Sequence, residues 1–285
     1  MLLSGCASAP SGVAARASAP LVPSSGVGVQ GVRLASGASF SGRGLGGGAS
    51  TRRGRAGLRS AAEAASSNPK GRQPWDVGRF LQTLVFFNNP FAREATAGAS
   101  ASSPLLDAAR GVRPSFGPLD DVVMGGVSLS GFRYEDGAGE KRGTPAGVFS
   151  GTVRVENNGG FASVRSKDVA WDLSGAKGIR IRVKSEDGNR YKLILRDDAN
   201  WDGISWCKSF DTAPGKWTTV SVPFKDFEPV FRARTLKGSQ LKAPFDQTNI
   251  RAVQLMVSKF EYDGALNPRF YPGEFRLAVD TIVPF

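Results

Sequence analysis

The sequence predicts an all-β fold, a jelly-roll sandwich of two antiparallel sheets, over residues 116–285. Short runs there alternate apolar and charged residues with the period of two that half-buried strands require. Turns rich in Gly, Asp and Asn separate these runs. The sequence shows no alternation of helical and strand patterns, which a doubly wound sheet would need. These three observations favour packed antiparallel sheets over a parallel α/β fold.

The clearest strand lies at residues 179–183, where Ile179, Ile181 and Val183 alternate with Arg180 and Arg182. Further strands are expected at residues 152–155, 161–164, 191–195, 204–210, 217–222, 252–258 and 275–282. An Asn-Asn-Gly-Gly turn at residues 157–160 is expected to join the first two of these as a hairpin. Four turn residues are expected to serve backbone geometry: Gly125, Gly126, Asn158 and Gly159.

The N-terminal part differs sharply in composition. Residues 1–60 hold seven arginines and no acidic residue, so they carry +7 of the net charge of +12 and leave +5 for the rest. A leader rich in Arg and Ser and free of acid is typical of an organelle transit peptide, and this composition suits a plastid or a mitochondrion equally. Residues 61–73 and 92–115, rich in Ala, Ser and Gly, are expected to be linkers.

Between these two linkers, residues 74–91 predict a short amphipathic helix. Phe80, Leu84 and Phe87 recur at helical spacing, Trp75 precedes them, and Asn-Asn-Pro ends the segment. The segment is too short to cross a bilayer. Two interpretations stay open: a helix docked on the sandwich, and a helix that binds a membrane surface or a partner.

Several kinds of chemistry are excluded by composition. The chain has no histidine, which removes Ser-His-Asp and Cys-His catalysis and imidazole metal sites. Cys207 is the one thiol outside the leader, so no disulfide partner is expected. A Gly-x-Gly-x-x-Gly match at residues 26–31 lies in the leader without a flanking strand or helix, and a calcium-type loop starting at Asp198 has Ser209 where its Glu should stand. We therefore expect no cofactor, no metal and no enzymatic activity.

Aromatic and basic residues interleave in the predicted loops. The tryptophans Trp201 and Trp206 and the tyrosine Tyr262 lie near basic positions that include Arg232, Arg234 and Lys259. Such residues suit stacking on bases, on sugars or on an apolar patch of a partner. The alternative is that they are half-buried rim aromatics covered by the stems of the basic side chains.

Six stretches spread over residues 116–285 carry a family resemblance. They are residues 119–128 (Leu-Asp-Asp-Val-Val-Met-Gly-Gly-Val-Ser), 147–151 (Gly-Val-Phe-Ser-Gly), 157–161 (Asn-Asn-Gly-Gly-Phe), 191–202, 229–234 (Pro-Val-Phe-Arg-Ala-Arg) and 254–264. Together they resemble the complex I intermediate-associated protein 30 (NADH:ubiquinone oxidoreductase assembly) domain family. Residues 75–80 (Trp-Asp-Val-Gly-Arg-Phe) are similar to a segment of its photosynthetic, plastid and cyanobacterial members.

The resemblance implies a galactose-binding-like jelly roll that acts as an assembly factor for a membrane energy-converting complex, photosynthetic or of the NADH dehydrogenase type. Its partners would be protein subunits of that complex, with peripheral contact to the thylakoid or the inner membrane. The candidate binding face combines matched positions and loop residues: Asp121, Trp201, Trp206, Arg232, Arg234, Lys259 and Tyr262. The expected location is the chloroplast, stroma or thylakoid surface, with the mitochondrion as the alternative.

Two other functions stay open at this point. Some plastid relatives with an additional dinucleotide-binding domain are tied to messenger RNA, so RNA binding in organelle gene expression is one alternative, and its electrostatic signature would be a steep loss of affinity with salt. A carbohydrate-binding module is the other, because a jelly roll with Trp201 and Trp206 beside loops could stack sugar rings.

Overall fold

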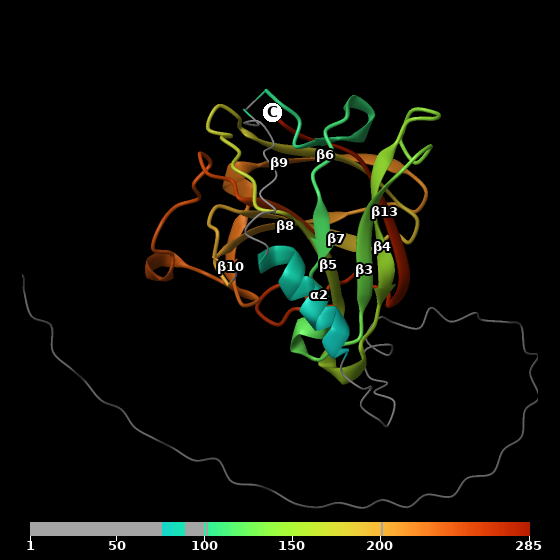
Figure 1. The fold of residues 1–285 in the computed structure, drawn as a ribbon. Coiled ribbons are helices and arrows are strands. Elements are labelled where there is room, and N and C mark those ends of the chain that lie inside the picture. The colour runs from blue at the N-terminus through green and yellow to red at the C-terminus, as the bar shows by residue number, and fades with distance from the viewer. Residues whose placement is uncertain (1–75, 89–99, 101, 201) are drawn as a thin grey trace, which may run out of the picture. The chain divides into compact units, whose positions relative to one another are not determined.

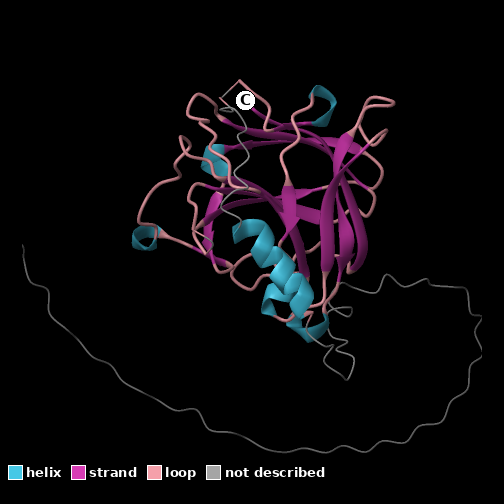
Figure 2. Cartoon of the chain, in the orientation of Figure 1, coloured by secondary structure: helices cyan, strands magenta, loops and turns pink. Residues whose placement is uncertain are grey.

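Two antiparallel sheets form the sandwich in the computed structural model, which describes residues 76–88, 100, 102–200 and 202–285 (Figures 1 and 2). The six-stranded sheet has the order β3-β4-β13-β6-β9, with β1 paired to β13, and the seven-stranded sheet has the order β11-β10-β8-β7-β12-β5-β2. The strands are β1 (Leu106–Asp107), β2 (Phe116–Pro118), β3 (Leu129–Glu135), β4 (Ala146–Val153), β5 (Phe161–Ser166), β6 (Gly178–Ser185), β7 (Arg190–Arg196), β8 (Ser205–Asp211), β9 (Trp217–Pro223), β10 (Glu228–Phe231), β11 (Arg234–Thr235), β12 (Ala252–Ser258) and β13 (Gly273–Pro284).

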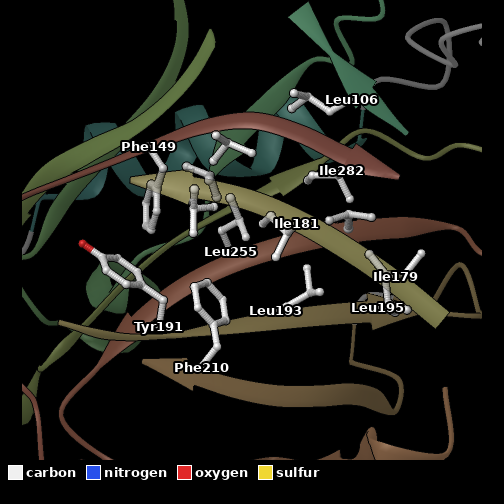
Figure 3. Packing of buried hydrophobic residues seen from close by; sticks show 14 of the residues in the cluster. Leu106, Phe149, Ile179, Ile181, Tyr191, Leu193, Leu195, Phe210, Leu255 and Ile282 are labelled. Atoms are coloured by element: carbon white, nitrogen blue, oxygen red, sulfur yellow. The ribbon is translucent and has the colours of Figure 1, made fainter. Parts of the chain in front are cut away.

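The predicted jelly-roll class is confirmed, and the side-chain alternation explains it. Because successive residues of a strand face opposite sides, β7 sends Tyr191, Leu193 and Leu195 into the sandwich and turns Lys192 and Arg196 outward. The apolar members of the neighbouring strands meet them in one continuous cluster, part of which Figure 3 shows around Phe149, Tyr191, Leu193 and Leu255. At the rim of this core the Tyr191 hydroxyl donates a hydrogen bond to Asp187 Oδ2 at 2.8 Å.

The turn at residues 157–160 was expected to close a hairpin, and that expectation is wrong. The strand before it, β4, belongs to the six-stranded sheet, whereas β5 after it belongs to the seven-stranded sheet. The turn therefore carries the chain across the sandwich. A short 3-10 helix, η3 (Glu156–Asn158), lies within it, and the left-handed φ values of Asn157 (56°) and Asn158 (60°) redirect the backbone.

The sandwich also begins before residue 116. β1 pairs with β13 through Leu106 and Ile282, and Leu105 and Leu106 are fully buried in the core. A 3-10 helix, η1 (Ala108–Arg110), follows β1. Residues 105–110 are thus part of the domain, although their composition had suggested a linker. Two residues of strand are too short to leave a periodic signal in the sequence.

The predicted helix is present as α2 (Val77–Asn88). Asp76 caps it, because its carboxylate accepts a hydrogen bond from the amide of Arg79 at 3.0 Å. It docks on the edge strand β2, where the Phe86 ring occupies the space that a side chain on Gly117 would need. The Phe87 ring lies 4.5 Å from the guanidinium carbon of Arg165. Figure 1 shows α2 lying against the sandwich. No helix among the described residues is long and apolar enough to span a membrane.

Candidate functional site

The Asp120–Asp121 pair holds the first family motif in place. The carboxylate of Asp121 is fully buried and accepts hydrogen bonds from the amide of Ser128 (2.9 Å), the hydroxyl of Ser128 (2.7 Å) and the amide of Gly160 (2.7 Å). A Cβ on Gly126 or Gly159 would come within 2.4 Å of this side chain. Asp121 was expected on the binding face, and this is corrected: its carboxylate is enclosed by protein and links two loops.

The other turn residues belong to the same junction. Gly125 ends the 3-10 helix η2 (Asp121–Met124) with a φ of 86°, a conformation that favours glycine. The side-chain amide of Asn157 donates to the carbonyl of Gly125 at 3.0 Å, which ties the Asn-Asn-Gly-Gly turn to this glycine. Lys259 also lies at this junction, because its amide donates to the carbonyl of Gly160 at 2.7 Å.

The hairpin of β10 and β11 has a strained turn at the surface. Its two turn residues, Arg232 and Ala233, both have left-handed φ values, 48° and 63°. Neither is Gly, Asn or Asp, the residues that adopt this conformation at low cost. The neighbouring loop interlocks with the turn: the amide of Asp263 (φ 58°) donates to the carbonyl of Ala233, and the amide of Thr235 donates to the Asp263 carboxylate, both at 3.0 Å.

This strained turn presents two arginines to solvent. The Arg232 guanidinium forms an ion pair with Asp202 and lies 5.1 Å from the Phe231 ring, while 70% of its side chain remains exposed. Arg234 is exposed two residues further along β11. The hydrogen bond that Arg232 donates to the Asp202 carboxylate raises the pKa of Arg232, which keeps this guanidinium charged. Strain of this kind persists where the surrounding structure enforces it, and it clusters at functional sites.

Tyr262 connects the hairpin loop to the sheet beneath it. Its ring lies 4.4 Å from the Lys192 ammonium group, which in turn donates to the carbonyls of Phe260 (2.6 Å) and Glu261 (3.1 Å). Burial lowers the pKa of Lys192 and raises that of the Tyr262 hydroxyl. The structure therefore brings Arg232, Arg234 and Tyr262 together, and we call the β10–β11 turn with the Tyr262–Asp263 loop the hairpin site.

Cys207 lies below Tyr262 on β8, in a small apolar cluster with Ile194 and Val230. The thiol is 2% exposed, and burial raises its pKa to about 12. A thiol with this pKa is almost entirely protonated at neutral pH and is a poor nucleophile. Cys207 therefore acts as a small core residue of the hairpin site.

The remaining predicted residues do not join the hairpin site. Trp206 is 5% exposed in the main core, where its Nε1 donates to Asp197 Oδ2 at 2.9 Å and its ring packs 4.9 Å from that of Phe245. It was expected on the binding face, and its burial corrects this. Trp201 and Trp75 lie outside the described residues. Trp206 is thus a core residue, neither on the binding face nor at a half-buried rim.

The outer face of the seven-stranded sheet carries a group of buried cations that the sequence did not predict. Arg165 on β5 and Lys192 and Arg196 on β7 are each at most 7% exposed. Arg196 donates to Ser205 Oγ (3.0 Å) and to the carbonyl of Asn200 (2.8 Å), and burial lowers the pKa of Arg165 to about 9. The alternation in β7 places these charges outward, but only the folded loops show that they are covered.

Two faces of α2 carry apolar residues. The predicted face, Phe80, Leu84 and Phe87, is half-buried, and Phe87 contacts Arg165 of the sandwich. Val77, Leu81 and Val85, spaced by one helical turn each, form a second apolar stripe that is 48%, 53% and 70% exposed. We call these three residues the α2 stripe.

The part of the chain that the structure describes offers no metal centre. No group of three or more His, Cys, Asp or Glu side chains there could hold an ion. Asp197, Asp198 and Asp202 follow β7, but Asp197 accepts from Trp206, Asp198 lies near Arg196, and Asp202 pairs with Arg232. Each of these carboxylates thus already interacts with an arginine or with the indole of Trp206.

The sandwich domain matches a known protein family over most of its length. A family model described as complex I intermediate-associated protein 30 matches residues 112–279. An uncharacterized protein of Schizosaccharomyces pombe is 30% identical over 158 residues, which cover 51% of this chain and 69% of that protein.

Solved structures with a similar fold include carbohydrate-binding modules. One is the family 11 module of the cellulosomal cellulase Lic26A-Cel5E of Clostridium thermocellum, with 19% identity, 66% of this chain and 97% of that chain covered, and a TM-score of 0.46. Another is CsCBM6-3 from Clostridium stercorarium in complex with cellobiose, with 11% identity, coverage of 67% and 98%, and a TM-score of 0.30. The match over residues 112–279 is the decisive one: this chain belongs to the complex I intermediate-associated protein 30 family.

Proposed function

We propose that this protein is a non-catalytic assembly factor that holds a protein subunit of a membrane energy-converting complex, and that it does so in the chloroplast. The hairpin site carries the proposal. Its turn keeps Arg232 and Ala233 in a strained conformation that two hydrogen bonds to the Asp263 loop enforce. A turn that served only to connect β10 and β11 would gain stability from Gly or Asn at these positions, so the strain favours a binding role for the exposed arginines.

Family membership supports the class of partner. The family is named for association with an intermediate of complex I. The chemistry at the hairpin site suits a protein surface with carboxylates, since Arg232 and Arg234 present guanidinium groups that can bind them in a bidentate manner. Tyr262 and Phe231 add partly buried aromatic area beside these charges. Large aromatic and Arg side chains are the usual anchors of protein interfaces.

The α2 stripe supports contact with a membrane surface or a membrane subunit. The helix is fixed to the sandwich through Phe86, while Val77, Leu81 and Val85 face solvent. Three exposed aliphatic residues on one short helix are more than docking requires. We infer that the stripe positions the hairpin site close to the membrane in which the complex is assembled.

The experiment is an affinity purification of the protein from detergent-solubilised organelles, with and without nuclease. We expect subunits of a thylakoid complex to co-purify and to resist nuclease. The variant R232A/R234A should lose them, while K141A/R142A, which removes two exposed cations from the loop between β3 and β4, should retain them. Retention by a folded R232A/R234A variant would reject the hairpin site.

The same purification separates the alternatives. Ribonucleoprotein that disappears with nuclease would replace the proposal by RNA binding, and mitochondrial complex I subunits would move the protein to the mitochondrion. A fusion of residues 1–75 to a fluorescent protein tests the location directly. We expect import into chloroplasts, and import into mitochondria alone would contradict the plastid assignment.

A further inference from the structure

β9 is an open edge of the six-stranded sheet. It pairs with β6 from Trp217 to Pro223, and no strand follows it in the sheet order. Among the described residues, no backbone group of residues 217–223 bonds to another backbone group on the side away from β6. Figure 1 shows β9 beside β6 at the margin of the sandwich. A row of amide and carbonyl groups therefore lies available for a further strand.

The other sheet edges are protected, and β9 is not. β11 and β2 are only two and three residues long, and α2 docks on β2. β3 carries the charged residues Arg133 and Glu135. β9 has seven residues, none charged, with four β-branched side chains (Thr218, Thr219, Val220 and Val222) and its proline at the end. Proteins normally protect sheet edges from pairing with charged side chains, proline or short strand length. An edge without these features favours pairing with a further strand.

Two arginines of β6 reach across β9 toward this edge. Arg180 Nε donates to Ser221 Oγ at 3.1 Å, and Arg182 Nη1 donates to Thr219 Oγ1 at 2.9 Å. A strand added to β9 would lie about 4.8 Å beyond it. Arg182 is already ion-paired with Glu140, whereas Arg180, 5.1 Å from the Phe285 ring, is exposed beside this edge. On the opposite face Val220 is only partly buried although it packs against the main core. The outer face beside Arg180 thus favours an acidic side chain, and the inner face favours apolar ones.

We propose that β9 is a docking edge for an extended segment of another protein that alternates apolar and acidic side chains and extends the six-stranded sheet. The backbone of β9 would supply the hydrogen bonds, Val220 would receive the apolar residues, and Arg180 would receive an acidic one. The first 60 residues of this chain contain arginines and no acid, so their charge does not complement this edge. This surface is separate from the hairpin site and does not depend on it.

The test uses the full chain and two eight-residue peptides, one alternating Val with Glu and one alternating Val with Lys. Amide hydrogen exchange reports the contact, because backbone groups that enter a ladder become protected. We expect the Val/Glu peptide to protect alternate amides of β9 and the Val/Lys peptide to bind at least about tenfold more weakly, since like charges face each other.

Variants make the test specific. R180A should weaken Val/Glu binding about twofold to fivefold, and R180K should restore most of it. T218K places a lysine on the inner row of the edge and should abolish protection by both peptides, whereas K237A/K242A, on the loop after β11, should change nothing.

Four results would overturn the proposal. They are equal binding of the two peptides, protection at a site other than β9, protection of β9 that rises with protein concentration without peptide, and protection that is present in the free chain at every concentration. The third would show that a second copy occupies the edge, and the fourth that the chain itself covers it. The R232A/R234A variant tests the hairpin site alone, because these changes leave β9 intact. If this variant loses its partners but still binds the Val/Glu peptide at β9, the two proposals are shown to stand or fall separately.

Discussion

The Asp120 carboxylate lies 3.7 Å from the Arg79 guanidinium, and this ion pair joins α2 to the sandwich. Asp120 is 4% exposed and also accepts bonds from the amides of Ser130 (2.9 Å) and Ser163 (3.0 Å). One buried carboxylate therefore holds α2, β3 and β5 together. Asp120 belongs to the family motif at residues 119–128, so the position of the α2 stripe depends on this motif.

The stability of the domain should depend on pH through Asp120. Burial raises the pKa of Asp120 to about 6 from 3.8, so the folded state binds this proton more tightly than the unfolded state. Stability from this group is therefore gained as the pH falls through 6 and is complete below 3.8. Between pH 7 and pH 5 the wild type should gain about 1 kcal/mol relative to D120N, measured by urea unfolding at both values. Equal changes in the two proteins would contradict the raised pKa.

A methyl group at residue 117 should displace α2. A Cβ on Gly117 would meet the Phe86 ring at 2.3 Å, so G117A forces the ring from its seat. Amides of α2 should then lose protection from hydrogen exchange, while the sandwich keeps its own. The matched control is G131A on β3, where a Cβ meets nothing within 4 Å. Unchanged α2 protection in G117A would show that Phe86 does not anchor the helix.

Asp121 should be among the most sensitive positions for folding. The D121A variant leaves the buried amides of Ser128 and Gly160 without their acceptor, and each orphaned donor costs about 1–3 kcal/mol. We expect a loss of about 3 kcal/mol or more in the free energy of unfolding by urea. D136A, at an exposed position between β3 and β4, should lose less than about 0.5 kcal/mol. Similar losses in both would mean that Asp121 does not hold the junction.

The strands and the Asp121 junction differ in how far the sequence predicts them. Strands such as β6, β7 and β12 were predictable because their alternation reflects a buried and an exposed face. The same pattern cannot tell a hairpin from a crossing turn, so the role of residues 157–160 followed only from the sheet order. Burial of Asp121 depends on glycines far away in the chain, at 159 and 160, and a single sequence carries no signal of that contact.

The thiol of Cys207 should react only when the domain opens. Its pKa is raised to about 12 by burial, so little thiolate exists at pH 8 and reagents cannot reach it. In a C6S background, labelling with a disulfide reagent should be slow and should accelerate with urea in step with unfolding. Rapid labelling of the native protein would mean that the region below Tyr262 opens without global unfolding.

The strain of the hairpin site predicts a trade between stability and binding. In A233G, the turn residue adopts its left-handed φ of 63° without a Cβ, so the free energy of unfolding should rise by about 1 kcal/mol. In A265G, at an exposed loop position without a left-handed φ, the added chain entropy of glycine should lower it by roughly 0.5 kcal/mol. The stabilised turn keeps both arginines but gains backbone freedom before binding, so partner capture in the affinity purification should weaken. An A233G protein that is no more stable than the wild type would remove the strain argument for the hairpin site. Greater stability with undiminished capture would show that the strain serves something other than orienting Arg232 and Arg234.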